Sequence, residues 1–151
     1  MNRFGLWTVV VMLALLGTAC GSDGSGHPAN TCTAANSLCA RLTVPQNFSG
    51  SPTGMMAMFF TTPTPAGMPA AILAQVGSPA IGPDRPYDLK VENISAANGT
   101  YYFYVALYMP GGGTTTPVAG VDYAGRVTEP IQWDGSAVNL GEVPLALYQA
   151  P

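Results

Sequence analysis

The segment Thr100-Tyr-Tyr-Phe-Tyr-Val-Ala-Leu-Tyr-Met109 is the clearest β-strand of the chain, because aromatic and aliphatic residues run through it without Gly or Pro. Successive side chains of a strand point to opposite faces of the sheet. We expect one face to point into the core, and it carries Tyr101, Phe103, Val105, Leu107 and Met109. The other face carries Tyr102, Tyr104, Ala106 and Tyr108.

Shorter segments with strand character lie on both sides of this one, and Gly- and Pro-rich turns separate them. They cover 41–44, 55–62, 72–76, 87–92, 118–127, 131–133 and 143–148. Asn98-Gly99 and Asp134-Gly135 are typical turn dipeptides. No long segment after residue 20 repeats at helical spacing. The pattern predicts an all-β, antiparallel β-sandwich of about seven strands.

Residues 1–19 have the layout of a secretion signal. The positive charge of Arg3 precedes an apolar run over 6–16, and the small residues Gly17, Thr18 and Ala19 follow. The run is shorter than the roughly 20 apolar residues of a membrane-spanning helix. We therefore expect a helical signal peptide that is removed before Cys20.

Cys20 stands where bacterial lipoproteins carry their lipid, so residues 1–20 resemble a lipoprotein signal. Ordinary signal peptidase can cleave at the same bond, because Gly17 and Ala19 are small, and Cys20 would then carry no lipid. The chain has three cysteines, and exported proteins rarely keep a free thiol. Lipid on Cys20 leaves Cys32 and Cys39 as a pair, which favours lipidation and predicts a Cys32–Cys39 disulfide.

The remaining chain divides into a tether over 20–31, rich in Gly and Ser, and a single domain over 32–151. Four basic and eight acidic residues follow the signal, without a basic run. Nucleic acid is therefore not an expected partner. We expect an exported protein, anchored to a bacterial membrane through lipid on Cys20. Gly21, rather than Asp, follows this cysteine and favours the outer membrane.

The order of short motifs along the domain carries a resemblance to a known family. It comprises Tyr87-x-Leu89-x-Val91-x-x-Ile94, Asn98-Gly99-Thr100-Tyr101-Tyr102-x-x-Val105, Gly120-Val121-Asp122-Tyr123-Ala124-Gly125, Trp133-Asp134-Gly135-x-x-Val138 and Val143-x-Leu145-x-Leu147. These motifs resemble the transthyretin-like, carboxypeptidase-regulatory-like β-sandwich domains. The resemblance implies an immunoglobulin-like sandwich with an accessory role, in which the domain packs, spaces or binds.

Two sets of residues are candidate sites. The first is a candidate face for a ligand or partner, formed by Tyr102, Tyr104 and Tyr108 with Trp133 nearby. A tyrosine can bury its ring while its hydroxyl stays in contact with water. A calcium site using Asp84 and Asp122 is the weaker hypothesis, because calcium takes six or more oxygen ligands. We therefore predict no metal site and no cofactor.

Catalysis is not expected from this composition. His27, the one histidine, lies in the tether beside Pro28, so no Ser/His/Asp arrangement can form without it. Members of the resembled family with hydrolase activity use several histidines and a C-terminal Tyr-Arg-Gly-Ser, which this chain lacks. The leading hypothesis is a non-enzymatic, lipid-anchored accessory or interaction module of the cell envelope. The alternative is a lipoprotein that binds a carbohydrate or other ligand through its tyrosines.

Overall fold

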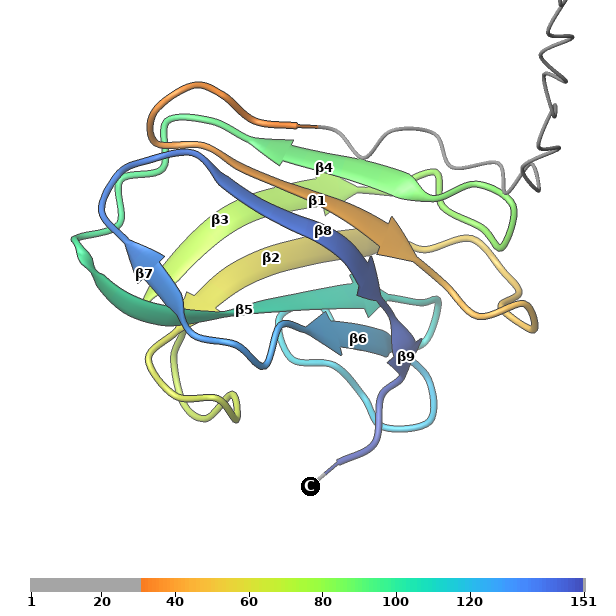
Figure 1. Cartoon of the computed structure of the whole chain (residues 1–151). Helices are drawn as coiled ribbons and strands as arrows, with labels where there is room; N and C mark the ends of the chain where they lie inside the picture. Colours follow the sequence, from red (N-terminus) through yellow and green to blue (C-terminus); the bar gives the residue numbers. More distant parts are fainter. Residues whose placement is uncertain (1–30, 151) are drawn as a thin grey trace, which may run out of the picture.

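The computed structural model describes residues 31–150, which form two β-sheets packed face to face (Figure 1). The small sheet has the strand order β4 (Tyr87–Val91), β1 (Leu38–Thr43) and β8 (Val138–Pro144). The large sheet has the order β3 (Ala71–Gly77), β2 (Gly54–Phe60), β5 (Gly99–Tyr108), β6 (Tyr123–Arg126) and β9 (Ala146–Leu147). β7 (Ile131–Trp133) pairs with the first residues of β5.

The prediction of an all-β fold with two sheets is confirmed for the described residues, with differences in detail. Nine strands are present there rather than about seven. One pair, β1 with β8, is parallel, so the prediction of a wholly antiparallel sandwich is wrong at this point. The predicted strand over 143–148 is also two elements, because the chain leaves the small sheet after Pro144 and joins the large sheet at Ala146.

The core between the sheets is built on the inner face of β5, as its alternation predicts. Phe103, Val105 and Leu107 are fully buried in the main hydrophobic cluster. Phe59 of β2 stacks on Tyr101, with ring centroids 5.0 Å apart. β2 pairs with β5 along its whole length, so these rings are held side by side by backbone pairing.

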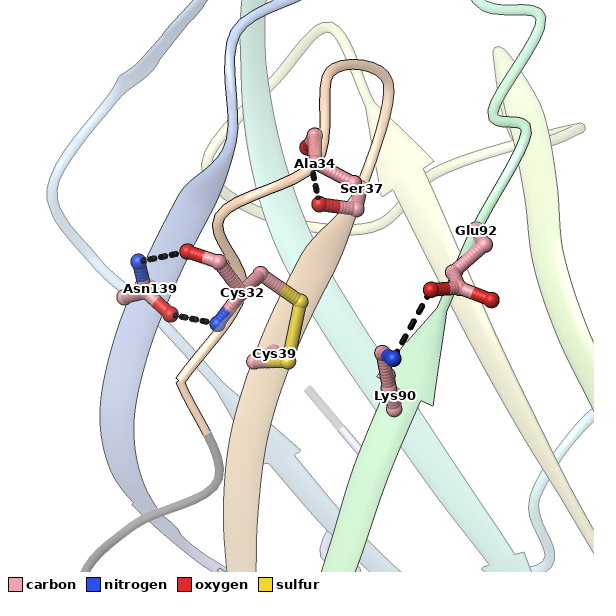
Figure 2. Close-up of a disulfide and its surroundings, with 7 residues drawn as sticks. All are labelled: Cys32, Ala34, Ser37, Cys39, Lys90, Glu92 and Asn139. Carbon is pink, nitrogen blue, oxygen red and sulfur yellow. Dashed lines mark hydrogen bonds and ion pairs between the residues drawn. A yellow bond between two sulfur atoms is a disulfide. The ribbon is translucent and has the colours of Figure 1, made fainter.

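The disulfide expected between Cys32 and Cys39 is present, with the two Cα atoms 5.5 Å apart (Figure 2). Closing so short a loop stabilises the fold by about 2–3 kcal/mol in the chain-entropy model. The Asn139 side chain of β8 holds the same point. Its Oδ1 accepts from the Cys32 N–H at 2.7 Å, and its Nδ2 donates to the Cys32 carbonyl at 3.0 Å. The domain is therefore fastened to β8 where the chain enters it.

The predicted signal peptide (1–19), Cys20, His27 and all but the last residue of the predicted tether (20–31) lie outside the described residues. Among residues 31–150, no helix has the length and hydropathy needed to cross a membrane.

Gly125 of β6 lies where the chain crosses from the small to the large sheet. A Cβ at this position would lie 2.7 Å from Leu145 Cδ2 and 2.8 Å from the Pro144 carbonyl oxygen. Such distances are shorter than side chains tolerate, so the sheets can approach here only over a glycine. The β6 backbone and the crossing segment are thus packed directly against each other.

We expect Gly125→Ala to lower the free energy of unfolding by about 1–3 kcal/mol, because the added methyl group overpacks this contact. Gly54→Ala is the matched control, since a Cβ on this strand glycine meets ordinary contacts of 3.6 and 3.7 Å. Its change should stay within about 0.5 kcal/mol. Urea unfolding of the two variants measures the difference, and equal stabilities would contradict this account of the crossing.

Candidate binding groove

The three tyrosines expected on one face lie together on the outer surface of the large sheet. Tyr102 pairs with Phe60, Tyr104 with Met58 and Tyr108 with Gly54. Side chains of this face form a second apolar cluster, separate from the core between the sheets. Its buried members are Met56, Met58, Phe60, Tyr104, Ala106 and Tyr108. Tyr104 is 8% exposed and Tyr108 only 3%, so this face is more deeply covered than a free aromatic platform.

Trp133 does not belong to this face, so the expectation that it lies near the three tyrosines is wrong. It is 2% exposed and packs edge-on against Phe59 inside the sandwich, with ring centroids 5.7 Å apart. Its indole N–H donates to the Ala96 carbonyl at 3.2 Å. A buried indole needs such an acceptor, and this one fixes the ring in the core.

A groove of about 580 Å³ lies beside Tyr104, along β6 and the C-terminal segment. This volume is within the range of small-molecule sites. Its lining comes from the β2–β3 loop, from β5 and β6, and from the end of the chain. The lining residues are Thr64, Pro65, Tyr104, Ala124, Gly125, Arg126, Thr128, Pro144, Ala146, Leu147, Tyr148 and Gln149.

We call this site the tyrosine groove, and its polar side chains combine one cation with groups that both donate and accept hydrogen bonds. Arg126 is exposed and is the one charged side chain in the lining given by residues 31–150. Hydroxyl groups come from Tyr104, Tyr148 and two threonines, and an amide comes from Gln149. No carboxylate side chain of the described residues lines it, although acidic residues outnumber basic ones in the chain. The groove therefore suits a ligand with an apolar surface and acceptor or anionic groups.

The environment of Tyr104 shows how close the groove side chains are to one another. Burial, followed by the neighbouring Tyr148 and Tyr108 phenols, raises the pKa of Tyr104 to about 12, and the positive charge of Arg126 acts in the opposite direction. Burial and the charge of Asp122 also raise the pKa of Tyr108. The Tyr108 hydroxyl has no hydrogen-bond partner among the described residues, so its ring serves packing. Both phenols are neutral at physiological pH.

Asp122 organises the loop that follows β5, and sequence reasoning missed this role. Its buried carboxylate accepts three backbone hydrogen bonds at 2.7 Å: Oδ1 from Met109, and Oδ2 from Gly113 and Val118. A Cβ on Gly112 would lie 1.9 Å from Oδ1, so this position requires glycine. The missing side chain of Gly112 thus leaves the space that the carboxylate occupies.

The hydrogen bonds of Asp122 also argue against a calcium site at this residue. Three amide donors already surround the carboxylate, whereas a calcium site needs several converging oxygen ligands. Residues 31–150 contain no group of three or more His, Cys, Asp or Glu side chains placed to hold a metal ion.

On the small sheet, the Arg41 guanidinium pairs with Asp88 and the Lys90 ammonium with Glu92 (Figure 2 shows the second pair).

The sequence pattern does not predict three parts of the groove that lie beside Tyr104: Tyr148, Arg126 and the β2–β3 loop. Tyr148 and Arg126 stood within the predicted strands 143–148 and 118–127, and nothing in either pattern places them beside Tyr104. Thr64 of the β2–β3 loop precedes Tyr148 by 84 residues in the sequence. A signal was present in the charge pattern, because Arg126 is the one basic residue after Lys90.

Comparison of the chain with protein-family models, with curated proteins and with solved structures finds no match in any of the three. The transthyretin-like resemblance stays a prediction that rests on the motif residues of the chain.

In an alkaline titration followed by phenolate absorbance, Tyr104 should ionise near pH 12. The unfolded chain releases this proton near pH 10, so the neutral phenol stabilises the fold below pH 10, and this contribution is lost as the pH rises through 12. Tyr148→Phe should lower the pKa of Tyr104 and Arg126→Gln should raise it. Tyr104→Phe identifies the step, and a pKa unmoved by Tyr148→Phe would refute their proximity.

Asp122→Asn should lower the free energy of unfolding by about 2–4 kcal/mol, because the amide group turns a donor toward backbone donors that are left without a partner. Amide hydrogen exchange should accelerate at Met109, Gly113 and Val118. Asp134→Asn is the control, since Asp134 is exposed and its hydrogen bonds come from its own turn, from Ser136 and from its own backbone. An Asp122→Asn variant as stable as this control would argue against the role of Asp122.

Proposed function

We propose that this chain is a non-enzymatic lipoprotein of the bacterial cell envelope, anchored through lipid on Cys20, with a transthyretin-like sandwich that acts as an interaction module. Its contact site is the tyrosine groove, and its location is the outer membrane. The single observation that carries the proposal is the composition of the groove: within the lining given by residues 31–150 it has two phenols, one cation and no carboxylate side chain.

The described carboxylates support binding rather than catalysis. Asp122 is saturated by backbone amides, Asp88 is paired with Arg41, and Glu92 with Lys90. Asp134 accepts the Ser136 N–H, and these hydrogen bonds lower the pKa of its carboxyl group. None of these four lines the groove, and neither do the three other carboxylates of residues 31–150, Asp84, Glu129 and Glu142. A general acid or base must lie within hydrogen-bond reach of the bound substrate.

The disulfide supports the anchor. Cys32 and Cys39 are bonded to each other, which leaves Cys20 as the one cysteine of the chain outside this disulfide. In an oxidising compartment a single cysteine directly after a signal sequence is best accounted for by a covalent lipid.

A carbohydrate ligand is the second candidate, and the groove lining favours it over other small molecules. The half-buried Tyr148 can stack on the apolar face of a sugar ring beside the edge of Tyr104, while Thr64, Thr128 and Gln149 offer groups to its hydroxyls. An open groove also accommodates one unit of a longer chain. A glycan array probed with the purified full chain tests this candidate.

The proposal is tested on the native lipoprotein. Intact mass should show lipid on Cys20, and Cys20→Ser should release the protein from membranes. Cross-linking in membranes should capture a defined envelope partner, and Arg126→Ala should reduce its yield at least tenfold. Arg85→Ala is the matched control, because it removes the same charge from an exposed position outside the groove.

The outcomes separate the candidates. Glycan binding that Tyr104→Ala abolishes, in a variant with native hydrogen exchange in β2 and β6, supports the carbohydrate ligand. Absence of glycan binding, with a partner whose capture depends on Arg126, supports the protein module. Substrate turnover by the purified chain overturns both, and an unmodified Cys20 overturns the anchor.

A further inference from the structure

β3 differs from every other strand at an edge of the described sheets, because it combines a length of seven residues with the absence of any charge or proline. Edge strands are normally protected by charges, prolines, bulges or short length. β4 carries Asp88 and Lys90, and β8 carries Glu142 and ends at Pro144. On the far edge of the large sheet, β7 has three residues and β9 two.

β3 itself is seven residues long and contains neither charge nor proline. The uncharged sequence around it extends from Leu42 to Pro83. β2 occupies one side of β3, and no described strand occupies the other. Ile72 of β3 is 54% exposed. An exposed isoleucine in an edge strand favours pairing with a second strand.

The side-chain pattern of β3 is self-complementary. Ile72 pairs with Met58 and Gln75 with Met56, so both point to the outer face of the sheet. Antiparallel pairing of two copies, about a twofold axis between residues 73 and 74, sets Ile72 of one copy opposite Gln75 of the other. The same register sets Ala71 opposite Val76, and both face the core.

The bulge of β3 is compatible with this register. The pairing with β2 shifts between Ala57 and Met58, which leaves Leu73 as the extra residue. Leu73 lies beside the proposed twofold axis, so the irregularity falls at the centre of the new ladder and each half keeps its alternation.

We propose that β3 is a homodimer interface, at which two copies of this chain join their large sheets into one continuous sheet by antiparallel pairing. The contact is isologous and closes on itself, because each copy offers one long unprotected edge. A seven-residue ladder is small beside the interfaces of permanent dimers, so association depends on concentration. The interface is separate from the tyrosine groove, which lies at the β6 and β9 side of the sheet.

Sedimentation of the full chain, purified in detergent over a concentration series, tests the proposal. We expect a monomer–dimer equilibrium, and a loss of dimer of at least tenfold in the double variant Ile72→Lys, Gln75→Lys. The double variant Thr114→Lys, Thr115→Lys adds the same charge to the exposed loop after β5 and should keep the dimer. Unchanged urea midpoints show that each variant is folded.

A cysteine pair tests the register directly. In the double variant Ile72→Cys, Gln75→Cys, each new thiol faces its counterpart in the second copy, and oxidation should yield a dimer that reductant dissolves. Within one copy the two positions are about 10 Å apart, too far for a disulfide. The double variant Asp88→Cys, Glu92→Cys places two thiols on or next to the charged edge strand β4 and should stay monomeric.

Two results would overturn the interface. One is a native chain that is monomeric at every concentration and in the cysteine trap. The other is a dimer that persists unchanged in the Ile72→Lys, Gln75→Lys variant. Partner capture by the groove is measured independently with Arg126→Ala, so the two proposals can fail separately.

Discussion

The alternation of side chains along β5 is the constraint on which both halves of this domain depend. β5 pairs with β2 along one edge and with β7 and β6 along the other, so its position is set by three neighbours. Its inner residues supply the centre of the core, and its outer residues supply the tyrosines of the second cluster. Because a slip of one residue would exchange the two faces, the core and the groove are specified by the same register.

Charge is divided between the two sheets. The small sheet carries Arg41, Asp88 and Lys90 on exposed or half-buried positions, where they form ion pairs at its surface. β2, β3 and β5 of the large sheet lie in two stretches without any charged residue, 42–83 and 93–121. A solvated surface usually mixes charges over its whole area. The large sheet is therefore the side on which contact with other molecules costs least desolvation, and the groove and the β3 edge both belong to it.

Sequence could predict what depends on local pattern. The period of two along 100–109 assigns the faces of β5 correctly, and the cysteine count alone is enough to pair Cys32 with Cys39. It could not place Trp133, because a three-residue strand has too few alternations to say which face is inside. Nor could it assemble the tyrosine groove, whose walls at Thr64 and Tyr148 meet only through the tertiary fold.

The C-terminal segment joins the stability of the sandwich to the shape of the groove. β8 pairs with β1 in the small sheet, Leu145 is buried at the crossing, and β9 then pairs with β6 in the large sheet. The Tyr148 N–H donates to the Asp122 carbonyl, and the Tyr148 carbonyl accepts from Gly120. One groove wall is therefore part of the closure between the sheets rather than a free loop. A wall held in this way loses little conformational entropy when a ligand binds, which favours affinity.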